Sequence, residues 1–385
     1  MLEGIVTWAE IDLDAIAHNV QAFKHHVGLG VEVMAVVKAN AYGHGALPVA
    51  RTALEAGASR LAVHRLIEGI ELRQAGIDAP ILVMGYTPPN GAGLAARWRL
   101  TPSLITLEFA HALSLHAQAL GIRLPVHVKV DTGIGRYGLL PAELLEFMRS
   151  LHELPGIHVE GLFTHFATAD ASDPTHILAQ LGIFNQIISQ LDQSGLKPPF
   201  LHAANSAAAM QYPQAQFQAV RIGIAMYGLR PSLNWDPPFK ISPALTLKSL
   251  VTRLRELPAG SAIGYGRTFI TQRTTHVALL PVGYGDGYHR SLSNKGVVLV
   301  GGQRAPLLGR VSMDQIVVDV THIPDVQQDD EVVLIGSQGN ERISAEEVGA
   351  LAGTLNYEVT TALLPRVVRF YRRVGEVIEV VSIAD

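Results

Sequence analysis

The sequence predicts an α/β protein in which a TIM-type (β/α)8 barrel is followed by a mainly β C-terminal domain. Up to about residue 232, compact apolar runs alternate with longer stretches of helical period. Beyond residue 233 the apolar period becomes two, with glycine-rich turns. At ~150 residues per domain, a chain of 385 residues is long enough for both. We therefore expect a barrel over 11–232 and a β domain over 233–385 that also includes an N-terminal strand over 1–10.

The barrel prediction depends on apolar runs short enough for parallel strands that are buried on both faces. A helix is expected before the first run, since Asp12 is a candidate cap and Leu13, Ile16, Val20 and Phe23 follow at helical spacing. An open doubly wound sheet is the alternative architecture. The eight runs are VEVMAVV (31–37), RLAVH (60–64), PILVMG (80–85), LTPSLI (100–105), PVHVKV (125–130), IHVEGLF (157–163), PFLHA (199–203) and VRIGI (220–224).

The β domain is predicted from runs of alternating apolar residues between turn signals. Only SAEEVGALAGT (344–354) is expected to be helical there, with Ser344 as its cap and Glu347 three residues later. The expected strands lie in ALTLKSLVTRL, HVALLPV, VVLVGGQRAPLLGRV, QIVVDV, EVVLIG and VGEVIEVV.

Composition excludes several classes of function. Thirty basic and 34 acidic side chains leave a net charge of −4, so nothing favours binding to nucleic acid or to an anionic membrane. The chain has no cysteine, which removes disulfides, thiolate metal sites and cysteine nucleophiles and favours the cytoplasm. The 16 histidines form no HExxH motif or compact cluster with carboxylates, so we expect no catalytic metal. No signal-like start or transmembrane run is apparent.

Lys38 lies directly after the first apolar run, in AVVKANAYGHG, where it faces Tyr42, His44 and a flexible turn at Gly43 and Gly45. Barrel enzymes carry their reacting groups at the C-terminal ends of the strands. Burial would lower the pKa of the lysine and make it a nucleophile toward carbonyl groups. The alternative is an ordinary strand-end lysine whose ammonium reaches solvent.

The motif AVVKANAYGHG closely resembles the cofactor-lysine motif of alanine racemases, and WAEIDLDAIAHN resembles the opening of that family. The resemblance continues in order over nearly the whole chain. It implies pyridoxal phosphate as cofactor, L- and D-alanine as substrates, D-alanine supply for peptidoglycan, and a homodimer with shared active sites. The other matching segments are VKVDTGIGRYG (128–138), EGLFTHFATAD (160–170), HAANSAA (202–208), VRIGIAMYGL (220–229), GYGRTF (264–269), GYGDGY (283–288), GRVSMDQ (309–315) and NYEV (356–359).

The resemblance implies two bases. Lys38 would hold pyridoxal phosphate as a Schiff base and handle the proton on the D-face, and Tyr265 of the β domain would handle the proton on the L-face. With a pKa near 10, about one phenol in a thousand is ionised at neutral pH, so Tyr265 needs nearby positive charge. His165 and Arg221 would supply it. Without the motif, Tyr265 would be interpreted as an aromatic residue of a β turn.

The resemblance also assigns the residues around the cofactor. Arg221 would meet the pyridine nitrogen and leave it an acceptor, because a guanidinium only donates; taken alone, Arg221 would be an ion-pair residue. His165 would flank the ring, with a satisfied core histidine as the alternative. The phosphate would be bound by Ser206, whose alternative is a helix cap, and by Tyr42, Gly223, Ile224 and Tyr357.

For the substrate, the resemblance implies that Arg136 binds the carboxylate with the backbone of Met313 from the partner subunit. Asp314 is expected to be structural. Lys129 matches a lysine that is often carbamylated and then orients Arg136; the alternative is a surface salt bridge. The residues matching the substrate entrance are Arg290, Arg310, Leu355 and Asp170.

Gly133, Gly135 and Gly138 spell GxGxxG, the phosphate fingerprint of dinucleotide-binding folds. The helix is delayed past Pro141, and the motif lies in the fifth βα unit, so we interpret it as a substrate loop. Four alternative functions remain at this point: a broader-specificity amino-acid (serine) racemase, a fold-related pyridoxal-phosphate decarboxylase, a non-catalytic carrier of the cofactor, and a lysine-dependent aldolase.

Overall fold

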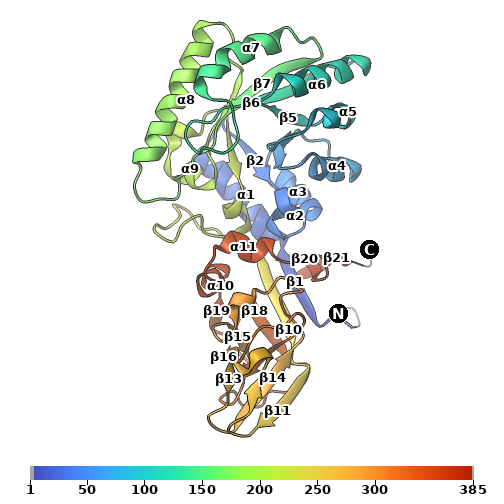
Figure 1. Cartoon of the computed structure of the whole chain (residues 1–385), viewed down its shortest axis with the longest axis vertical. Helices are drawn as coiled ribbons and strands as arrows, with labels where there is room; N and C mark the ends of the chain where they lie inside the picture. Colours follow the sequence, from blue (N-terminus) through green and yellow to red (C-terminus); the bar gives the residue numbers. More distant parts are fainter. Residues whose placement is uncertain (1–3, 384–385) are drawn as a thin grey trace. The chain divides into compact units, whose positions relative to one another are not determined.

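The computed structural model describes residues 4–383, which form two compact units (Figure 1). The barrel unit comprises Ile16–Ala41 and Ala46–Ser242. The β unit comprises the chain up to Ala15, the short segment Tyr42–Gly45, and the chain from Pro243 onward. Among the helices described, none combines the length and the apolar character needed to cross a bilayer.

Eight parallel strands close into a barrel in sequence order, from β2 to β9. The first strand pairs with the last, with Met34 opposite Arg221, so the sheet has no open edge. The predicted barrel is confirmed and the open sheet is wrong. The strands are β2 (Glu32–Val36), β3 (Arg60–Val63), β4 (Ile81–Val83), β5 (Thr101–Leu104), β6 (Leu124–Lys129), β7 (Ile157–Phe163), β8 (Phe200–His202) and β9 (Ala219–Ile222).

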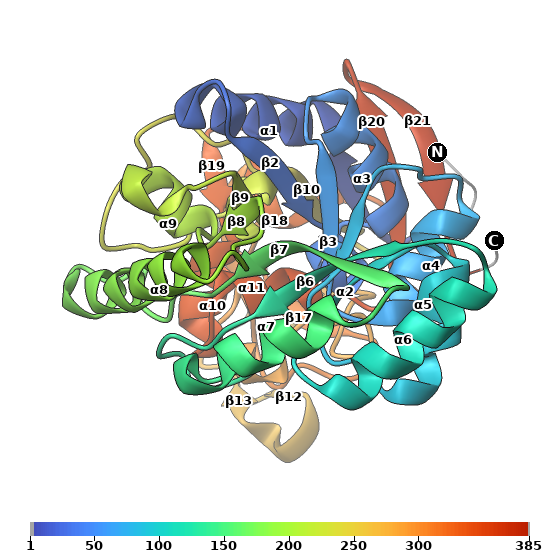
Figure 2. The same ribbon diagram turned by 90° about the horizontal axis from the view of Figure 1, so that it is seen from above.

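Helices surround these strands (Figure 2). The helix before the first barrel strand begins as predicted, because the Asp12 carboxylate accepts a hydrogen bond from the Ala15 N–H at 3.0 Å. Its apolar face is buried, with Ile16, Val20 and Phe23 at 0% exposure. The helices are α1 (Leu13–Val27), α2 (Lys38–Tyr42), α3 (Ala46–Glu55), α4 (Leu66–Gln74), α5 (Ala92–Arg97), α6 (Leu107–Ala119), α7 (Leu144–His152), α8 (Thr175–Gln193) and α9 (Ser206–Gln211), with 3-10 turns η1 (Pro89–Gly91), η2 (Pro141–Glu143), η3 (Pro213–Ala215) and η4 (Ile224–Tyr227).

The β unit is built on an eight-stranded sheet in which strands run in the order β16-β15-β18-β10-β1-β20-β21 and β19 pairs with β18. Strand β1 lies between β10 and β20. Separate small sheets are formed by β11-β14-β17 and β12-β13. The strands are β1 (Thr7–Asp12), β10 (Leu245–Leu250), β11 (Arg253–Leu257), β12 (Ala262–Ile263), β13 (Phe269–Ile270), β14 (Thr275–Leu280), β15 (Val297–Val300), β16 (Gln303–Pro306), β17 (Ile316–Asp319), β18 (Glu331–Gln338), β19 (Glu341–Ile343), β20 (Val368–Arg373) and β21 (Glu376–Val381).

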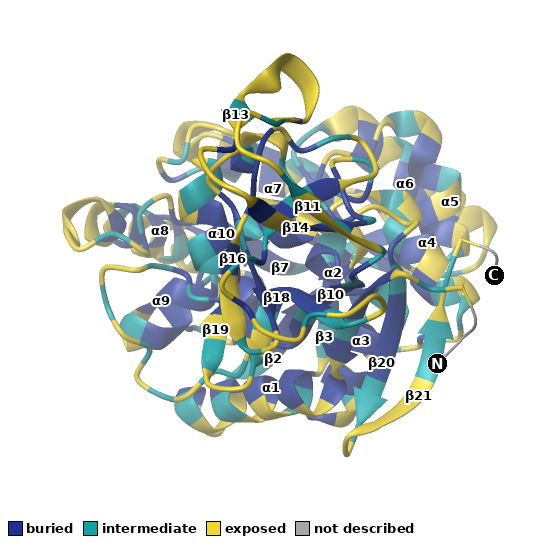
Figure 3. Cartoon of the chain, turned by 90° about the horizontal axis from the view of Figure 1, so that it is seen from below, coloured by how far each residue is buried: buried dark blue, intermediate teal, exposed yellow. Residues whose placement is uncertain are grey.

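The helix predicted in this unit is α10 (Ala345–Ala352), and the Ser344 side chain caps it by accepting from the Glu347 N–H at 3.1 Å. It is joined by α11 (Asn356–Thr361), so the prediction of a single helix is wrong. The 3-10 turns are η5 (Tyr265–Arg267) and η6 (Arg290–Leu292). In Figure 3 the strand β18 is largely buried, whereas β21 at the sheet edge is half-buried or exposed.

Candidate active site

The barrel gathers most of the predicted site residues of its own unit at one end. Lys38 follows β2, and Lys129 is the last residue of β6. His165 follows β7, and Arg221 is the second-to-last residue of β9. In a parallel barrel these positions share the C-terminal end, where barrel enzymes bind their substrates.

Directly after Lys38 the backbone forms a left-handed turn. Ala39, Asn40 and Ala41 have φ of 52°, 51° and 52° with ψ near 50°, and Tyr42 has φ of 53°. The left-handed conformation costs an L-residue roughly 1–2 kcal/mol, so the surroundings must hold it. Glu68 does so by accepting hydrogen bonds from the Ala39 N–H at 2.6 Å and from the N–H groups of His64 and Arg65, which directly precede α4. Glu68 thus fixes the backbone next to Lys38.

The turn after this segment is not flexible, contrary to the sequence prediction. A Cβ at Gly43 would lie 2.0 Å from the Thr360 carbonyl oxygen, and a Cβ at Gly45 would lie 1.7 Å from the Tyr371 hydroxyl. Both glycines also have positive φ. Only glycine fits at these positions, because the backbone is packed against its neighbours.

Four cationic side chains influence one another at the barrel mouth. Burial and the Arg136 charge lower the pKa of Lys38, against the opposing effect of Glu68. Burial and the Arg221 charge lower the pKa of Lys129 to about 8, and Lys38 and Arg136 contribute in the same direction. Since like charges are costly at close range, this mouth favours an anionic ligand.

Lys129 is 6% exposed, so the interpretation as a surface salt-bridge residue is wrong. Its ammonium lies 5.0 Å from the Tyr137 ring and 5.5 Å from the Phe163 ring. Within residues 4–383 it forms no ion pair with a carboxylate.

Arg221 is 3% exposed, and four neutral groups accept hydrogen bonds from it. Its guanidinium donates to His202 Nδ1 at 2.6 Å, to the carbonyls of Thr164 and Ala203 at 2.8 and 2.9 Å, and to His165 Nδ1 at 3.3 Å. Burial lowers its pKa to about 9, which leaves it protonated at neutral pH. The ion-pair alternative is wrong, since no carboxylate in the described part of the chain lies within 4.0 Å of Arg221.

His165 accepts from Arg221 through Nδ1, so the neutral ring carries its proton on Nε2. Burial and the Arg221 charge lower its pKa well below 6.5. The ring is half-buried rather than enclosed in the core. His165 is therefore a neutral residue at the barrel mouth with one donor nitrogen, so the expectation that it supplies positive charge is wrong.

The glycine-rich segment forms a loop around a carboxylate of this chain. Asp131 accepts hydrogen bonds from the N–H groups of Gly133, Ile134 and Gly135 through Oδ1 and of Arg136 through Oδ2. Burial raises the pKa of Asp131, but these N–H groups outweigh it and leave the pKa lowered. The donors that would bind a dinucleotide phosphate are thus occupied, and the loop instead presents the exposed Arg136.

Ser206 is not the cap of α9. Asn205 has that role, since its side chain accepts from the Ala208 N–H at 3.0 Å. The buried Ser206 hydroxyl accepts from the Gly223 N–H at 2.9 Å, which leaves its own proton available for donation. The Gly223 N–H is therefore already bonded, whereas Ile224 begins η4, where N–H groups have no partner within the turn.

Within the β unit, Tyr265 and Met313 are exposed, at 71% and 53%. Gly264 and Gly266 flank Tyr265 with φ of 70° and 72°, and a Cβ at Gly266 would lie 3.0 Å from Arg310 Nη1. A cation therefore lies beside the loop that presents this phenol.

The surroundings of the other predicted residues are as follows. Tyr42 is buried, its pKa is raised by burial, and its ring centroid is 6.3 Å from that of Tyr357. Asp314 forms an ion pair with Arg366 at 2.8 Å, which supports its structural role. Of the entrance residues, Leu355 is 68% exposed, Arg290 begins η6, and the Asp170 carbonyl accepts from the Trp235 indole.

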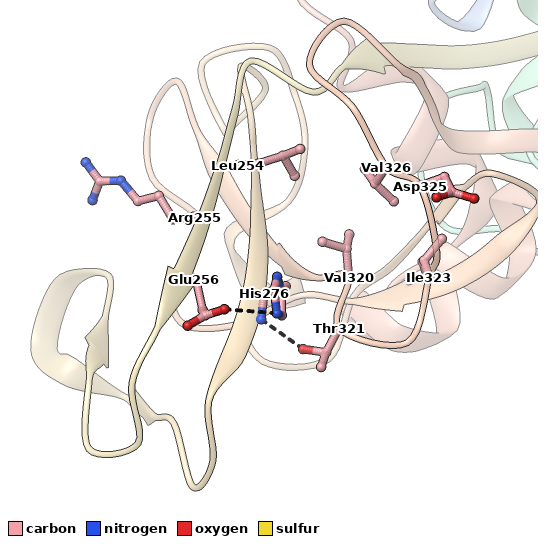
Figure 4. A pocket seen from close by; sticks show the side chains of 9 residues that line it. All are labelled: Leu254, Arg255, Glu256, His276, Val320, Thr321, Ile323, Asp325 and Val326. Atoms are coloured by element: carbon pink, nitrogen blue, oxygen red, sulfur yellow. Dashed lines mark hydrogen bonds and ion pairs between the residues drawn. The ribbon is translucent and has the colours of Figure 1, made fainter.

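A pocket of about 400 Å³ lies in the β unit and contains none of the predicted site residues (Figure 4). Three of its polar residues contact each other: His276 Nε2 lies 3.3 Å from Glu256, and the backbone N–H of His276 donates to the Thr321 hydroxyl. Among the described residues, no group of three or more His, Asp or Glu side chains is placed to hold a metal ion.

Sequence reasoning missed four residues that are hydrogen-bonded to predicted site residues, to a direct neighbour of one, or to each other: Glu68, His127, Glu160 and His202. The last three are polar residues inside otherwise apolar strand segments. That pattern was the available signal, since a buried polar side chain requires a partner.

Comparison with known proteins gives matches over nearly the whole chain. Residues 11–231 match the profile described as "Alanine racemase, N-terminal domain", and residues 244–371 match "Alanine racemase, C-terminal domain". Curated alanine racemases of Halothermothrix orenii and Desulforamulus reducens are 45% and 46% identical over 366 residues, covering 95% and 94% of this chain and 97% and 98% of the relative. The crystal structure of alanine racemase from Bacillus anthracis with bound L-Ala-P matches with a TM-score of 0.93 and 42% identity, over 98% of this chain and 97% of that one.

Proposed function

The chain belongs to the alanine racemase family and is a pyridoxal-phosphate-dependent isomerase, and on this premise we propose that Lys38 and Tyr265 are its two bases. The observation that carries the proposal is the position of Lys38, half-buried at the end of a barrel strand and surrounded by cations. A lowered lysine pKa gives more free amine at neutral pH, as both carbonyl attachment and proton transfer require.

The residues at the barrel mouth fit the cofactor. Its phosphate and phenolate are anionic, and the cluster of Lys38, Lys129, Arg136 and Arg221 has an excess of positive charge. The buried Ser206 hydroxyl has a proton to donate to a phosphate. When bound, pyridoxal phosphate withdraws electrons from the α-carbon of the amino acid and makes its proton easier to remove. The residues proposed to hold it are Lys38, Tyr42, His165, Ser206, Arg221, Gly223, Ile224 and Tyr357; Gly223 acts through Ser206 rather than as a free donor.

Arg221 is proposed to donate to the pyridine nitrogen. A guanidinium has no acceptor atom, so the ring nitrogen would receive a hydrogen bond without gaining a formal proton. The ring would then withdraw electrons less strongly than a ring with a protonated nitrogen, which would favour simple return of a proton to the α-carbon. Fold-related decarboxylases typically place an acidic residue at this nitrogen and use a cysteine from the partner subunit, and neither is present here.

Racemisation requires a base on each face of the α-carbon. We assign the proton of D-alanine to Lys38 and that of L-alanine to Tyr265 from the partner subunit. The exposure of Tyr265 and Met313 on the β unit is compatible with such a homodimer. Arg136, held by the Asp131 loop, is proposed to bind the substrate carboxylate with the Met313 backbone of the partner.

Lys129 is proposed to be carbamylated. With a pKa of about 8, about half of it is neutral amine at pH 8, against about one in 300 for an ordinary lysine. Carbamylation would replace a buried cation among cations by an anion that orients Arg136. We expect a ¹³C carbamate resonance in protein equilibrated with ¹³C-bicarbonate at pH 8, lost in Lys129→Arg. The exposed Lys295→Arg is the control, and a signal equal in both variants would refute the assignment.

The direct test of the function is incubation of the purified protein with pyridoxal phosphate and L-alanine, with D-alanine measured by chiral chromatography. Equimolar mixtures should be reached from either enantiomer. A protein that binds the cofactor without turnover would be a carrier, release of carbon dioxide would indicate a decarboxylase, and turnover without the cofactor would indicate an aldolase-type lysine. The same assay with serine measures breadth of specificity.

A cytoplasmic location and a role in peptidoglycan supply stay proposals. Fractionation tests the location, and the D-alanine dependence of a deletion strain tests the role.

A further inference from the structure

A line of hydrogen bonds crosses the barrel core from Arg221. Its guanidinium meets His202 Nδ1 at 2.6 Å, His202 Nε2 meets His127 Nδ1 at 2.8 Å, and His127 Nε2 meets Glu160 Oε2 at 3.0 Å. Both imidazoles are 0% exposed. The four residues come from β9, β8, β6 and β7, which are neighbours in the barrel.

Donor and acceptor roles along this line follow from its two ends. A guanidinium only donates, so His202 Nδ1 must accept and the neutral ring carries its proton on Nε2. That proton is donated to His127 Nδ1, so His127 also carries its proton on Nε2, facing Glu160. A carboxylate only accepts. The cation at one end and the anion at the other thus require the same tautomer of both histidines.

The far end of the line is fixed by a second arginine. Arg60 donates to both carboxylate oxygens of Glu160, at 3.0 and 3.1 Å, and to Glu32 at 2.9 Å. The hydrogen bond from His127, together with Arg60, outweighs burial and lowers the pKa of Glu160 to about 2.

The two imidazoles stay neutral between these charges. Burial lowers the pKa of His127 and of His202, as do the charges of Arg221 and Arg60, while Glu160 opposes this for His127. The Phe163 ring stacks on His202 at 4.7 Å between centroids and 9° between planes. No water-facing surface is left to either ring.

We propose that Glu160, His127 and His202 are positioning residues that orient Arg221 and place its counter-charge two imidazole rings away. A carboxylate in direct contact would draw the guanidinium toward itself and neutralise it locally. With the carboxylate at a distance, Arg221 is held by directional hydrogen bonds while its charge remains available at the barrel mouth. The proposal rests on the proposed function only for the cofactor atom that Arg221 meets.

The tautomers can be measured directly. We expect ¹⁵N–¹H correlation spectra of histidine-labelled full-length protein, with and without pyridoxal phosphate, to show both rings neutral and protonated on Nε2, without titration between pH 6 and 8. Single His127→Asn and His202→Asn variants assign the signals. An Nδ1–H tautomer or a charged ring at either position would overturn the proposal, whether or not the protein racemises alanine.

Glu160 and Glu32 both contact Arg60, but Glu160 also accepts from His127. Variants of the two glutamates therefore distinguish a positioning role from a structural ion pair. In Glu160→Gln we expect the His127 Hε2 resonance to move upfield by about 1 ppm, because the acceptor loses its charge. We expect kcat for alanine to fall about 10-fold through a displaced Arg221, with little change in KM. Glu32→Gln changes the other carboxylate that Arg60 contacts without touching His127, and it should change neither quantity. Equal effects of both variants, or an unmoved His127 signal in Glu160→Gln, would contradict a positioning role.

Discussion

Replacing Lys38 with alanine should lower racemisation by about 10⁴-fold or more, because it removes both the covalent attachment of the cofactor and one of the two bases. The loss should be chemical rather than structural. Lys38 is half-buried at a strand end, and Glu68 accepts a hydrogen bond from the Ala39 N–H in the left-handed turn that follows. The measurement is the initial rate in both directions, with circular dichroism to verify folding.

Lys197→Ala is the matched control, since Lys197 lies on the surface in an ion pair with Asp192. A second measurement identifies the attachment. Borohydride reduction of the cofactor-loaded protein should leave the pyridoxyl mass on the peptide that contains Lys38 and on no other. Retention of activity in Lys38→Ala, or the tag on another lysine, would remove the basis for every other role proposed here.

Tyr265→Phe should lower racemisation by about 10²–10⁴-fold, the usual contribution of a general acid or base. The effect should depend on the enantiomer. In D₂O, D-alanine should still exchange its α-proton through Lys38, whereas L-alanine should not exchange. Tyr212→Phe, at the end of α9, is the control. Equal loss of exchange for both enantiomers would show that Tyr265 does not serve one face.

The same two variants test the shared site. If Tyr265 acts in the partner subunit, subunit exchange between inactive Lys38→Ala and Tyr265→Phe dimers should restore about a quarter of the wild-type sites, because half the dimers are mixed and each has one intact site. If both bases came from one subunit, mixing would restore nothing.

The fold was predictable where a segment is decided by its own pattern. Each barrel strand lies within the apolar run that predicts it or one residue beyond, and Asp12 and Ser344 cap the helices as expected. Strand β20 was not predicted, because its arginines hide the alternation. Arg369 is 4% exposed and donates to the carbonyls of Gly43, Val367 and Leu363. Helix α11 is too short and too rich in β-branched residues to predict from propensity.

The site was predictable as a set of residues through family resemblance, but not as an arrangement. Nothing local in KANAY indicates a left-handed turn, since it depends on Glu68, which lies 29 residues from Ala39. His127 and His202 are 75 residues apart, so their hydrogen bond exists only in the closed barrel. Asn205 rather than Ser206 caps α9 because Gly223 uses the serine hydroxyl. Such contacts between distant segments are set by tertiary packing.

The Asp131 loop has a consequence for recognising nucleotide-binding proteins. Its glycines satisfy the familiar spacing, yet the chain supplies its own anion from the residue two positions before the first glycine. Because the N–H groups of the loop already donate to Asp131, they are not available to the phosphates of mononucleotides or dinucleotides. An aspartate at that offset, in any sequence with this glycine spacing, is thus a reason to look for a self-bound loop before searching for a nucleotide.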